Sequence, residues 1–293
     1  MTDEKRKGHY RGGKGTGRRP PRDKGPRVDS PEAWRKERAD SDRVSNKNFY
    51  LPWMPDKLTS DSIALLESLL SANSGVSSTA WVPMVDRDPS PVSTGCILGG
   101  TKFLWQKDGP PLPVCLGCKA PLHFVCQVDR ASLLHPLQGS GLVQVFACPR
   151  CVQDPTMKPR AACWATAIDA KRLDEYHEVA SEQPAGRRVV KWLPRKDFMH
   201  PQEAEALLNR SLSAEEWKVL GQSQIRGDKV GGFAPLLRPV ESPKCKTCSQ
   251  QMRLLLSMDS MDNVAFEWGK DGALLVFECA GHSDQVVALV VST

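Results

Sequence analysis

The chain has 293 residues, of which 40% are hydrophobic and 25% charged, and its formal net charge is +6. This length accommodates one large domain, or two smaller ones with a tail. The apolar run at 286–291 is too short to cross a bilayer and predicts a buried strand, so no membrane partner is expected. No hydrophobic segment follows the N-terminus. We therefore expect a protein of the cytoplasm, the nucleus or both that is not secreted.

The ten cysteines are the unusual feature of the composition. In a reducing compartment disulfides are uncommon, and paired cysteines more often hold a metal ion. A catalytic or regulatory dithiol is the alternative, but the sequence lacks the βαβ pattern in which such motifs are usually found. The cysteine usage therefore favours metal sites.

The basic charge is concentrated at the N-terminus. Residues 1–28 hold ten Lys or Arg against three acids and contribute +7, which leaves −1 of the total of +6 for the rest. This segment has too few apolar residues to offset the entropy of ordering, so we predict a disordered tail. It is interpreted as an RNA-binding arm, an import signal, or a solvated tail without a specific role. The candidate nucleic-acid contacts are Lys5, Arg6, Lys7, Arg11, Lys14, Arg18, Arg19 and Arg22.

Helix-start signals mark four segments. They predict helices over 31–40, over 60–71, over 201–208 and after Ser213. Ser213 and Glu216 have the spacing of a capping box. Most of the remaining chain alternates short apolar runs with Gly and Pro, a pattern that favours strands.

Two stretches of the chain repeat one another. Residues 115–129 align without a gap with 245–259, and both place a Cys-x-x-Cys pair before alternating apolar positions. That alternation predicts a strand with one buried face in each copy. Residues 141–148 then align with 272–279 as a second strand. We therefore predict a mainly β (α+β) fold of two pseudo-symmetric antiparallel β units with zinc-clipped hairpins and a few short helices.

The repeat also predicts the domain organisation. We assign a disordered basic tail and linker to 1–48, a helical or irregular lead-in to 49–94, the first zinc-clipped β repeat to 95–165, a helical connection to 166–228 and the second repeat to 229–293.

Each repeat carries four potential zinc ligands. In an antiparallel strand pair the start of the first strand lies near the end of the second, so the two ligand pairs of a repeat should meet. Zinc prefers four nitrogen or sulfur ligands in a tetrahedron. We expect two structural zinc ions, one bound by Cys115, Cys118, Cys148 and Cys151, the other by Cys245, Cys248, Cys279 and His282. Cys96, Cys126 and Cys163 lack ligand spacing, and we expect them in the core.

No catalytic motif is apparent. The sequence has no phosphate-binding loop, no H-E-x-x-H and no G-x-S-x-G. Four protein ligands leave a zinc ion no open position for water, which disfavours hydrolysis. We therefore expect a protein that is not an enzyme, with an enzyme that uses its thiols as the alternative.

The second repeat resembles a known family. The resemblance rests on 229–232, on the cysteine pair 245–248, on the strand 252–259, on Trp-Gly-Lys-Asp-Gly at 268–272 and on Leu-Val-Phe-Glu-Cys at 275–279. In this order the motifs look like those of the YwqG-like family and are similar to the related family of programmed cell death protein 2. The resemblance covers roughly residues 95–293 and is strongest over 229–282.

The resemblance implies a duplicated, mostly antiparallel β fold. For the programmed-cell-death branch it also implies a chaperone of a small-subunit ribosomal protein. This sequence departs from that branch because it has no separate MYND-type zinc finger between its halves. We therefore expect a non-enzymatic, zinc-stabilised protein-binding module, with a role as chaperone or adaptor in ribosome assembly as its most concrete form. The alternative is an RNA-binding protein that acts mainly through its basic tail.

Overall fold

The computed structural model describes residues 58–86, 95–106, 111–134, 137–154, 162–169, 171, 175–178, 186–234, 241–260, 262–264, 266–270 and 272–292. All of them belong to one compact unit, residues 47–293. The basic tail with its candidate nucleic-acid contacts and the expected helix over 31–40 lie outside the described residues.

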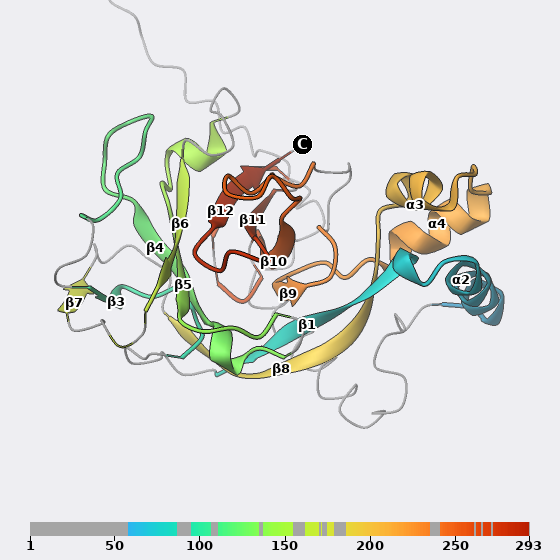
Figure 1. The fold of residues 1–293 in the computed structure, drawn as a ribbon, viewed down its shortest axis with the longest axis horizontal. Helices are drawn as coiled ribbons and strands as arrows, with labels where there is room; N and C mark the ends of the chain where they lie inside the picture. Colours follow the sequence, from blue (N-terminus) through green and yellow to red (C-terminus); the bar gives the residue numbers. More distant parts are fainter. Residues whose placement is uncertain are drawn as a thin grey trace, which may run out of the picture. The chain divides into compact units, whose positions relative to one another are not determined.

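Antiparallel strands dominate the described part of the chain (Figure 1). Ten of them form one sheet in the order β12-β11-β10-β9-β1-β8-β2-β4-β5-β6, and β3 pairs separately with β7. The strands of the large sheet are β1 (Ser77–Val85), β2 (Ile97–Leu98), β4 (His123–Asp129), β5 (Leu142–Ala147), β6 (Cys163–Ile168), β8 (Arg187–Phe198), β9 (Lys229–Gly231), β10 (Arg253–Asp259), β11 (Ala273–Glu278) and β12 (Val286–Val291); β3 is Lys102–Trp105 and β7 is Glu175–Glu178.

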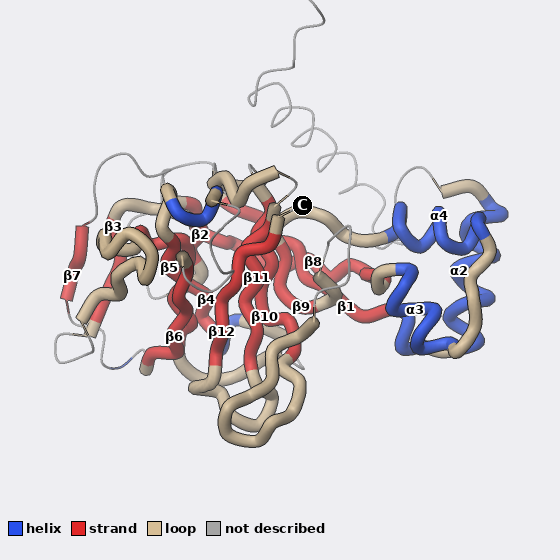
Figure 2. The backbone as a smooth tube through the Cα atoms, turned by 90° about the horizontal axis from the view of Figure 1, so that it is seen from above, coloured by secondary structure: helices blue, strands red, loops and turns tan. Residues whose placement is uncertain are grey.

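The strand order has an approximate two-fold symmetry. Chain order gives two series of five, β1-β2-β4-β5-β6 and β8-β9-β10-β11-β12, and the sheet order is the same from either end. The long strands β1 and β8 pair at the centre, but each also pairs with the other half's short strand, β1 with β9 and β8 with β2. The sheet curves until its two outermost strands, β6 and β12, lie side by side (Figures 1 and 2). The predicted fold class of two antiparallel β units is thus confirmed.

The repeat extends to irregularities of the backbone. The pairing of β4 with β5 shifts register between Phe124 and Cys126, and the pairing of β10 with β11 shifts between Leu254 and Leu256. These bulges occupy aligned positions of the two copies. A β-bulge increases local twist and bends its strand, so both hairpins curve at the same place.

The expected single buried face of these strands is wrong. All five central residues of β4 and of β10 are buried. One face packs into a core that both halves share, a single cluster of buried residues that includes Val128 and Val145 of the first half and Met258 and Val276 of the second. The other face is covered locally, in the first half by an aromatic cluster in which the Phe103 ring stacks on Phe124 at a centroid distance of 5.0 Å.

Three α-helices form a separate cluster beside the central strands in the described residues (Figure 2). They are α2 (Ser60–Ala72), α3 (Pro201–Leu208) and α4 (Ala214–Ser223). The short 3-10 turn η1 (Ser74–Val76) packs with them, whereas η2 (Arg130–Ser132) and η3 (Cys151–Gln153) lie elsewhere. The helices over 60–71 and 201–208 and the capping box at the start of α4 are confirmed. None of the described helices is long and apolar enough to span a membrane.

Two segments contain more strand than expected. The connection 166–228 holds β8, twelve residues long, in addition to α3 and α4. The lead-in 49–94 holds β1 after α2. Both strands carry a proline, Pro83 or Pro194, and β8 is rich in Arg and Lys, which hides their strand character in the sequence.

Candidate metal centres

A tight turn presents the first cysteine pair. The amide of Cys115 donates to the carbonyl of Ala120 at 2.8 Å, and the amide of Lys119 donates back to the carbonyl of Cys115 at 2.9 Å. Lys119 has a φ of 62°, a left-handed conformation that is uncommon outside glycine. A bridge between Val114 and Pro121 closes the turn. The turn thereby places Cys115 and Cys118 on one side.

The Cys-x-x-Cys pair of the second repeat lies in a turn of the same kind. The backbone amide of Cys245 donates to the carbonyl of Gln250 at 2.9 Å, and the backbone amide of Ser249 donates to the carbonyl of Cys245 at 2.9 Å. Ser249 has a φ of 60°, and Lys244 bridges Gln251. Both turns thus repeat bond for bond at aligned positions.

The second ligand pair of each half follows the second strand of its hairpin. The amide of Cys148 donates to the carbonyl of Ala162 at 2.8 Å, which anchors the residue directly after β5, and Cys151 begins the turn η3. After β11, Cys279 donates to the carbonyl of Gln285 at 3.1 Å, while Gln285 donates to the carbonyl of His282 at 2.9 Å. The antiparallel hairpins therefore bring the first and second ligand pairs together.

The structure forms two clusters of potential metal ligands from the eight predicted residues. One comprises Cys115, Cys118, Cys148 and Cys151, the other Cys245, Cys248, Cys279 and His282, and within each all four ligand atoms lie within 4.8 Å of one another. No other such cluster occurs among the described residues. All ten cysteines are free of disulfides.

The spacing of the donor atoms fits tetrahedral zinc. Bonds of about 2.3 Å to sulfur and about 2.0 Å to nitrogen place tetrahedral ligands about 3.5–3.8 Å apart. The Sγ atoms of Cys118 and Cys148 are 3.6 Å apart, as are those of Cys248 and Cys279. His282 turns Nδ1 toward the thiols, at 3.5 Å from Cys279 and 3.7 Å from Cys245. The two clusters fit two structural zinc ions.

Each cluster contains one thiol that ionises easily. The backbone amide of Ala120 and then the Cys148 thiol lower the pKa of Cys118 to about 7. Burial opposes ionisation of Cys245, but the backbone amides of Cys248 and Thr247 outweigh it and lower its pKa to about 6. Burial and the Cys118 thiol raise the pKa of Cys151 to about 12. Zinc binding must therefore displace the proton of the Cys151 thiol, which makes the affinity of the first site depend on pH.

The remaining predicted residues lie elsewhere. Cys96, Cys126 and Cys163 are buried and belong to neither cluster, as expected for core residues. The basic residues proposed to contact nucleic acid fall outside the described part of the chain, so their role stays a prediction.

Sequence reasoning missed a charged group beside the second cluster. Arg130, at the end of the first hairpin's opening strand, donates to the carbonyl of Ser283, the residue after His282, at 2.9 Å. The same guanidinium pairs with Glu278, the residue before Cys279. The sequence did offer a signal for this contact. Glu278 is an acid at the end of the apolar run before Cys279, and a buried carboxylate requires a partner of opposite charge.

Comparison with known proteins adds no homologue, because the chain matches no protein-family model and no curated protein. The assignment of the two zinc sites therefore rests on donor chemistry and geometry.

Proposed function

We propose that this chain is a non-enzymatic protein-binding module whose two zinc ions hold the sheet rather than act on a substrate. The proposal rests on one observation, which is that the protein supplies all four ligands in both clusters. Each offers four protein ligands at tetrahedral spacing, which leaves no coordination position for water or substrate. The zinc ions then stabilise the hairpins on which a binding surface is built.

Exposed apolar side chains support a binding role. Among the described residues, Leu116 is 65% exposed at the tip of the first cysteine turn, and Val190 and Leu134 are 56% and 52% exposed. Exposed apolar groups are common singly, but groups that lie together mark interaction sites. Val190 and Leu134 line the same cavity.

The most concrete version of the proposal is a chaperone or adaptor for a ribosomal protein, in keeping with the resemblance of residues 229–282 to the programmed-cell-death branch. A direct test is to synthesise each small-subunit ribosomal protein in a cell-free system with and without the zinc-loaded chain. We expect one of them to stay soluble after centrifugation only when the chain is present. If the chain keeps none of them soluble, the ribosomal version is wrong.

The alternative function is RNA binding through the basic tail. It is favoured by the charge distribution, because residues 1–28 contribute +7 and the remainder −1. Deletion of residues 1–28 separates the two functions. The RNA hypothesis predicts a steep, salt-dependent loss of RNA affinity in the deletion variant, whereas the chaperone hypothesis predicts that the deletion variant still keeps its client soluble.

A further inference from the structure

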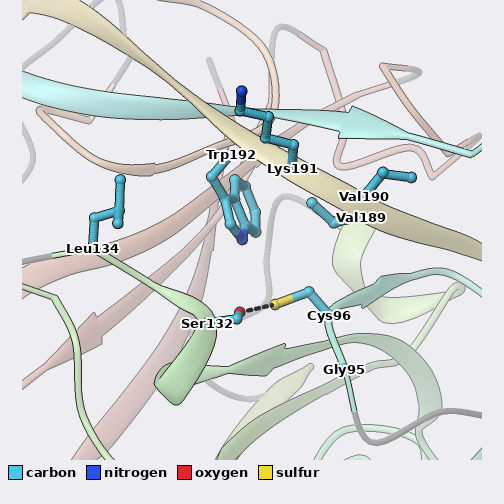
Figure 3. Close-up of a pocket in the computed structure, with 8 residues that line it drawn as sticks. All are labelled: Gly95, Cys96, Ser132, Leu134, Val189, Val190, Lys191 and Trp192. Atoms are coloured by element: carbon cyan, nitrogen blue, oxygen red, sulfur yellow. Dashed lines mark hydrogen bonds between the residues drawn. The ribbon is translucent and has the colours of Figure 1, made fainter.

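The strongest unexplained feature is a cavity of about 370 Å³ beside the long strand β8 (Figure 3). It is lined by Gly95, Cys96, Ser132, Leu134, Val189, Val190, Lys191 and Trp192. The cavity is distinct from both zinc clusters, since none of its lining residues is a proposed ligand.

The cavity lies where β8, among the described residues, has a strand neighbour on one side only. On one side β8 pairs with β1 from Val189 to Phe198, but on the other β2 pairs only with Arg187 and Arg188. One more hydrogen bond, from the Val189 amide to the Cys96 carbonyl at 3.0 Å, ends this contact. Within the described chain, the next residues of β8 have a strand partner on the β1 side only. Such an edge is the usual place for an extended segment to add to a sheet.

The cavity contains one hydrogen-bond donor without a strong acceptor. Trp192 is 8% exposed, its indole Nε1 has only the Cys96 sulfur, a weak acceptor, as a possible partner, and the nitrogen points into the cavity in Figure 3. The neighbouring polar groups are already engaged. Ser132 donates to the Asp129 carbonyl at 2.7 Å, and the Asp129 amide donates to the Cys96 sulfur at 3.2 Å. A buried donor that has only a weak acceptor carries a desolvation cost, which a carbonyl oxygen of a ligand would relieve.

The Cys96 sulfur in the cavity is not a nucleophile. Burial raises the pKa of its thiol, and the contributions of Ser132 and Trp192 that would favour the thiolate do not outweigh this effect. The cavity is therefore suited to binding rather than to covalent chemistry.

The charge of β8 indicates the partner. Five of its twelve residues are Arg or Lys, namely Arg187, Arg188, Lys191, Arg195 and Lys196. Its single acid, Asp197, is fully buried and paired with Lys229, whereas Arg188 is paired with Asp86 at 3.0 Å, and Lys191 is the basic residue of β8 that lines the cavity. Apolar walls at Val190 and Leu134 thus adjoin a basic strand, which complements an apolar side chain flanked by acidic residues.

We propose that this cavity docks an extended acidic segment of a protein client, which inserts one apolar side chain between Leu134 and Val190 while one of its backbone carbonyls accepts the Trp192 indole N–H. This site rests on the proposed protein-binding function and gives it a location and a ligand class. The pairing of β1 with β8 has a bulge at Met84 and Val85, opposite Val189 to Lys191. A bulge bends the strand and increases its twist, so the edge of β8 changes direction beside the cavity.

Binding of defined peptides to the full zinc-loaded chain tests the site. The probe is a fluorescein-labelled peptide that alternates Glu with Leu or Val, compared with the same peptide carrying Lys for Glu, and the readout is fluorescence anisotropy. We expect the acidic peptide to bind and the basic one not to bind. Trp192→Phe keeps the aromatic ring without the N–H and should weaken binding about fivefold. Leu134→Glu should weaken it roughly tenfold or more, by placing a like charge in the apolar wall.

Leu207→Glu is the matched control, since Leu207 is also an exposed apolar residue but lies on α3, outside the cavity. All variants must retain the zinc content and near-UV circular dichroism of the parent chain. Equal affinity of the parent and Trp192→Phe, equal binding of the basic peptide, or displacement of the acidic peptide by polyuridylate would each overturn the proposal.

Failure of the cavity and failure of the proposed function are distinguishable. If Leu134→Glu still keeps a ribosomal protein soluble as well as the parent chain does, the function stands and the cavity is not its site. If the acidic peptide binds in a Trp192-dependent way while no ribosomal protein gains solubility, the cavity stands and the ribosomal client is wrong.

Discussion

Arg130 and Glu278 form a buried ion pair that joins the two halves of the sheet, with an N–O distance of 2.7 Å and side chains 4% and 0% exposed. Arg130 follows β4 of the first half, and Glu278 ends β11 of the second. Arg253 contacts the same carboxylate at 2.7 Å from a position 32% exposed. The Arg130 guanidinium also donates to the Ser283 carbonyl, so it fixes the loop that holds His282.

We predict that both variants that remove this pair destabilise the protein, and that Glu278→Gln does so more than Arg130→Met. Glu278→Gln leaves Arg130 buried without its counter-charge and should lower the free energy of unfolding by about 3–5 kcal/mol. Arg130→Met should cost less, because Glu278 retains Arg253. Urea denaturation of the zinc-loaded variants measures these differences.

Asp86→Asn is the control for that series. It breaks the pair between Arg188 and Asp86, which has the similar distance of 3.0 Å but side chains 53% and 36% exposed. Exposed pairs contribute at most about 1 kcal/mol. If Asp86→Asn were as destabilising as Glu278→Gln, burial would not be the cause of the predicted cost.

The zinc content is predicted to be about two ions per chain. Elemental analysis of protein purified without chelator should find about one ion in Cys115→Ser and about one in Cys245→Ser, because each variant loses one ligand of a different site. Cys163→Ala removes a buried thiol outside both clusters and should leave the content at about two. A chain without zinc, or one that loses both ions in each single variant, would contradict two independent sites.

Two glycines should respond differently to alanine. Gly232 has a φ of 69°, and a Cβ there would collide with the carboxylate of Asp197, so Gly232→Ala should be strongly destabilising. Gly281 lies between ligands Cys279 and His282, yet a Cβ there meets no atom within 4 Å. Gly281→Ala should therefore keep both zinc content and melting temperature near the parent values. Differential scanning calorimetry with zinc analysis compares the pair.

The sequence predicted the hairpins and their ligands better than it predicted the centre of the sheet. Aligned cysteines and apolar runs are local signals that survive divergence, and the hairpin register then brings the ligand pairs together. β1 and β8 are defined instead by long-range pairing with each other, from Ser77 opposite Phe198 onward. Because β8 carries five basic residues and a proline, its local composition argues against a strand, and only its partner makes it one.

The pairing of each long central strand with the short strand of the other half also could not be predicted from local sequence patterns. Nothing in residues 77–98 indicates that β1 lies beside β9 rather than beside β2. The left-handed conformations of Lys119 and Ser249 were equally hidden, because non-glycine residues carry no strong signal for positive φ. By contrast, Ser213 and Glu216 predicted their capping box correctly, because all of its partners lie within one helical turn.

The same capping box predicts a pH dependence. Arg210 pairs with Glu216 at 2.6 Å, and this hydrogen bond, assisted by the Ser213 amide, lowers the pKa of Glu216 to about 2. A carboxyl whose folded pKa lies below its unfolded value of about 4.3 stabilises the fold fully above that value. The contribution is lost as the pH falls from about 4.5 through 2. Since Arg210 is 44% exposed, solvent screening keeps it modest.

Glu216→Gln tests this prediction, because glutamine can still accept from the Ser213 amide but carries no charge. We expect the variant to be less stable than the parent at pH 7 and the difference to shrink steadily below pH 4.5. Glu215→Gln is the control, since Glu215 lies in the same first turn of α4 but is not the capping-box partner. Urea denaturation of the three proteins at matched pH values cancels the loss of zinc common to all of them. A gap between parent and Glu216→Gln that stays constant down to pH 3 would show that the charge of Glu216 is not what stabilises the turn.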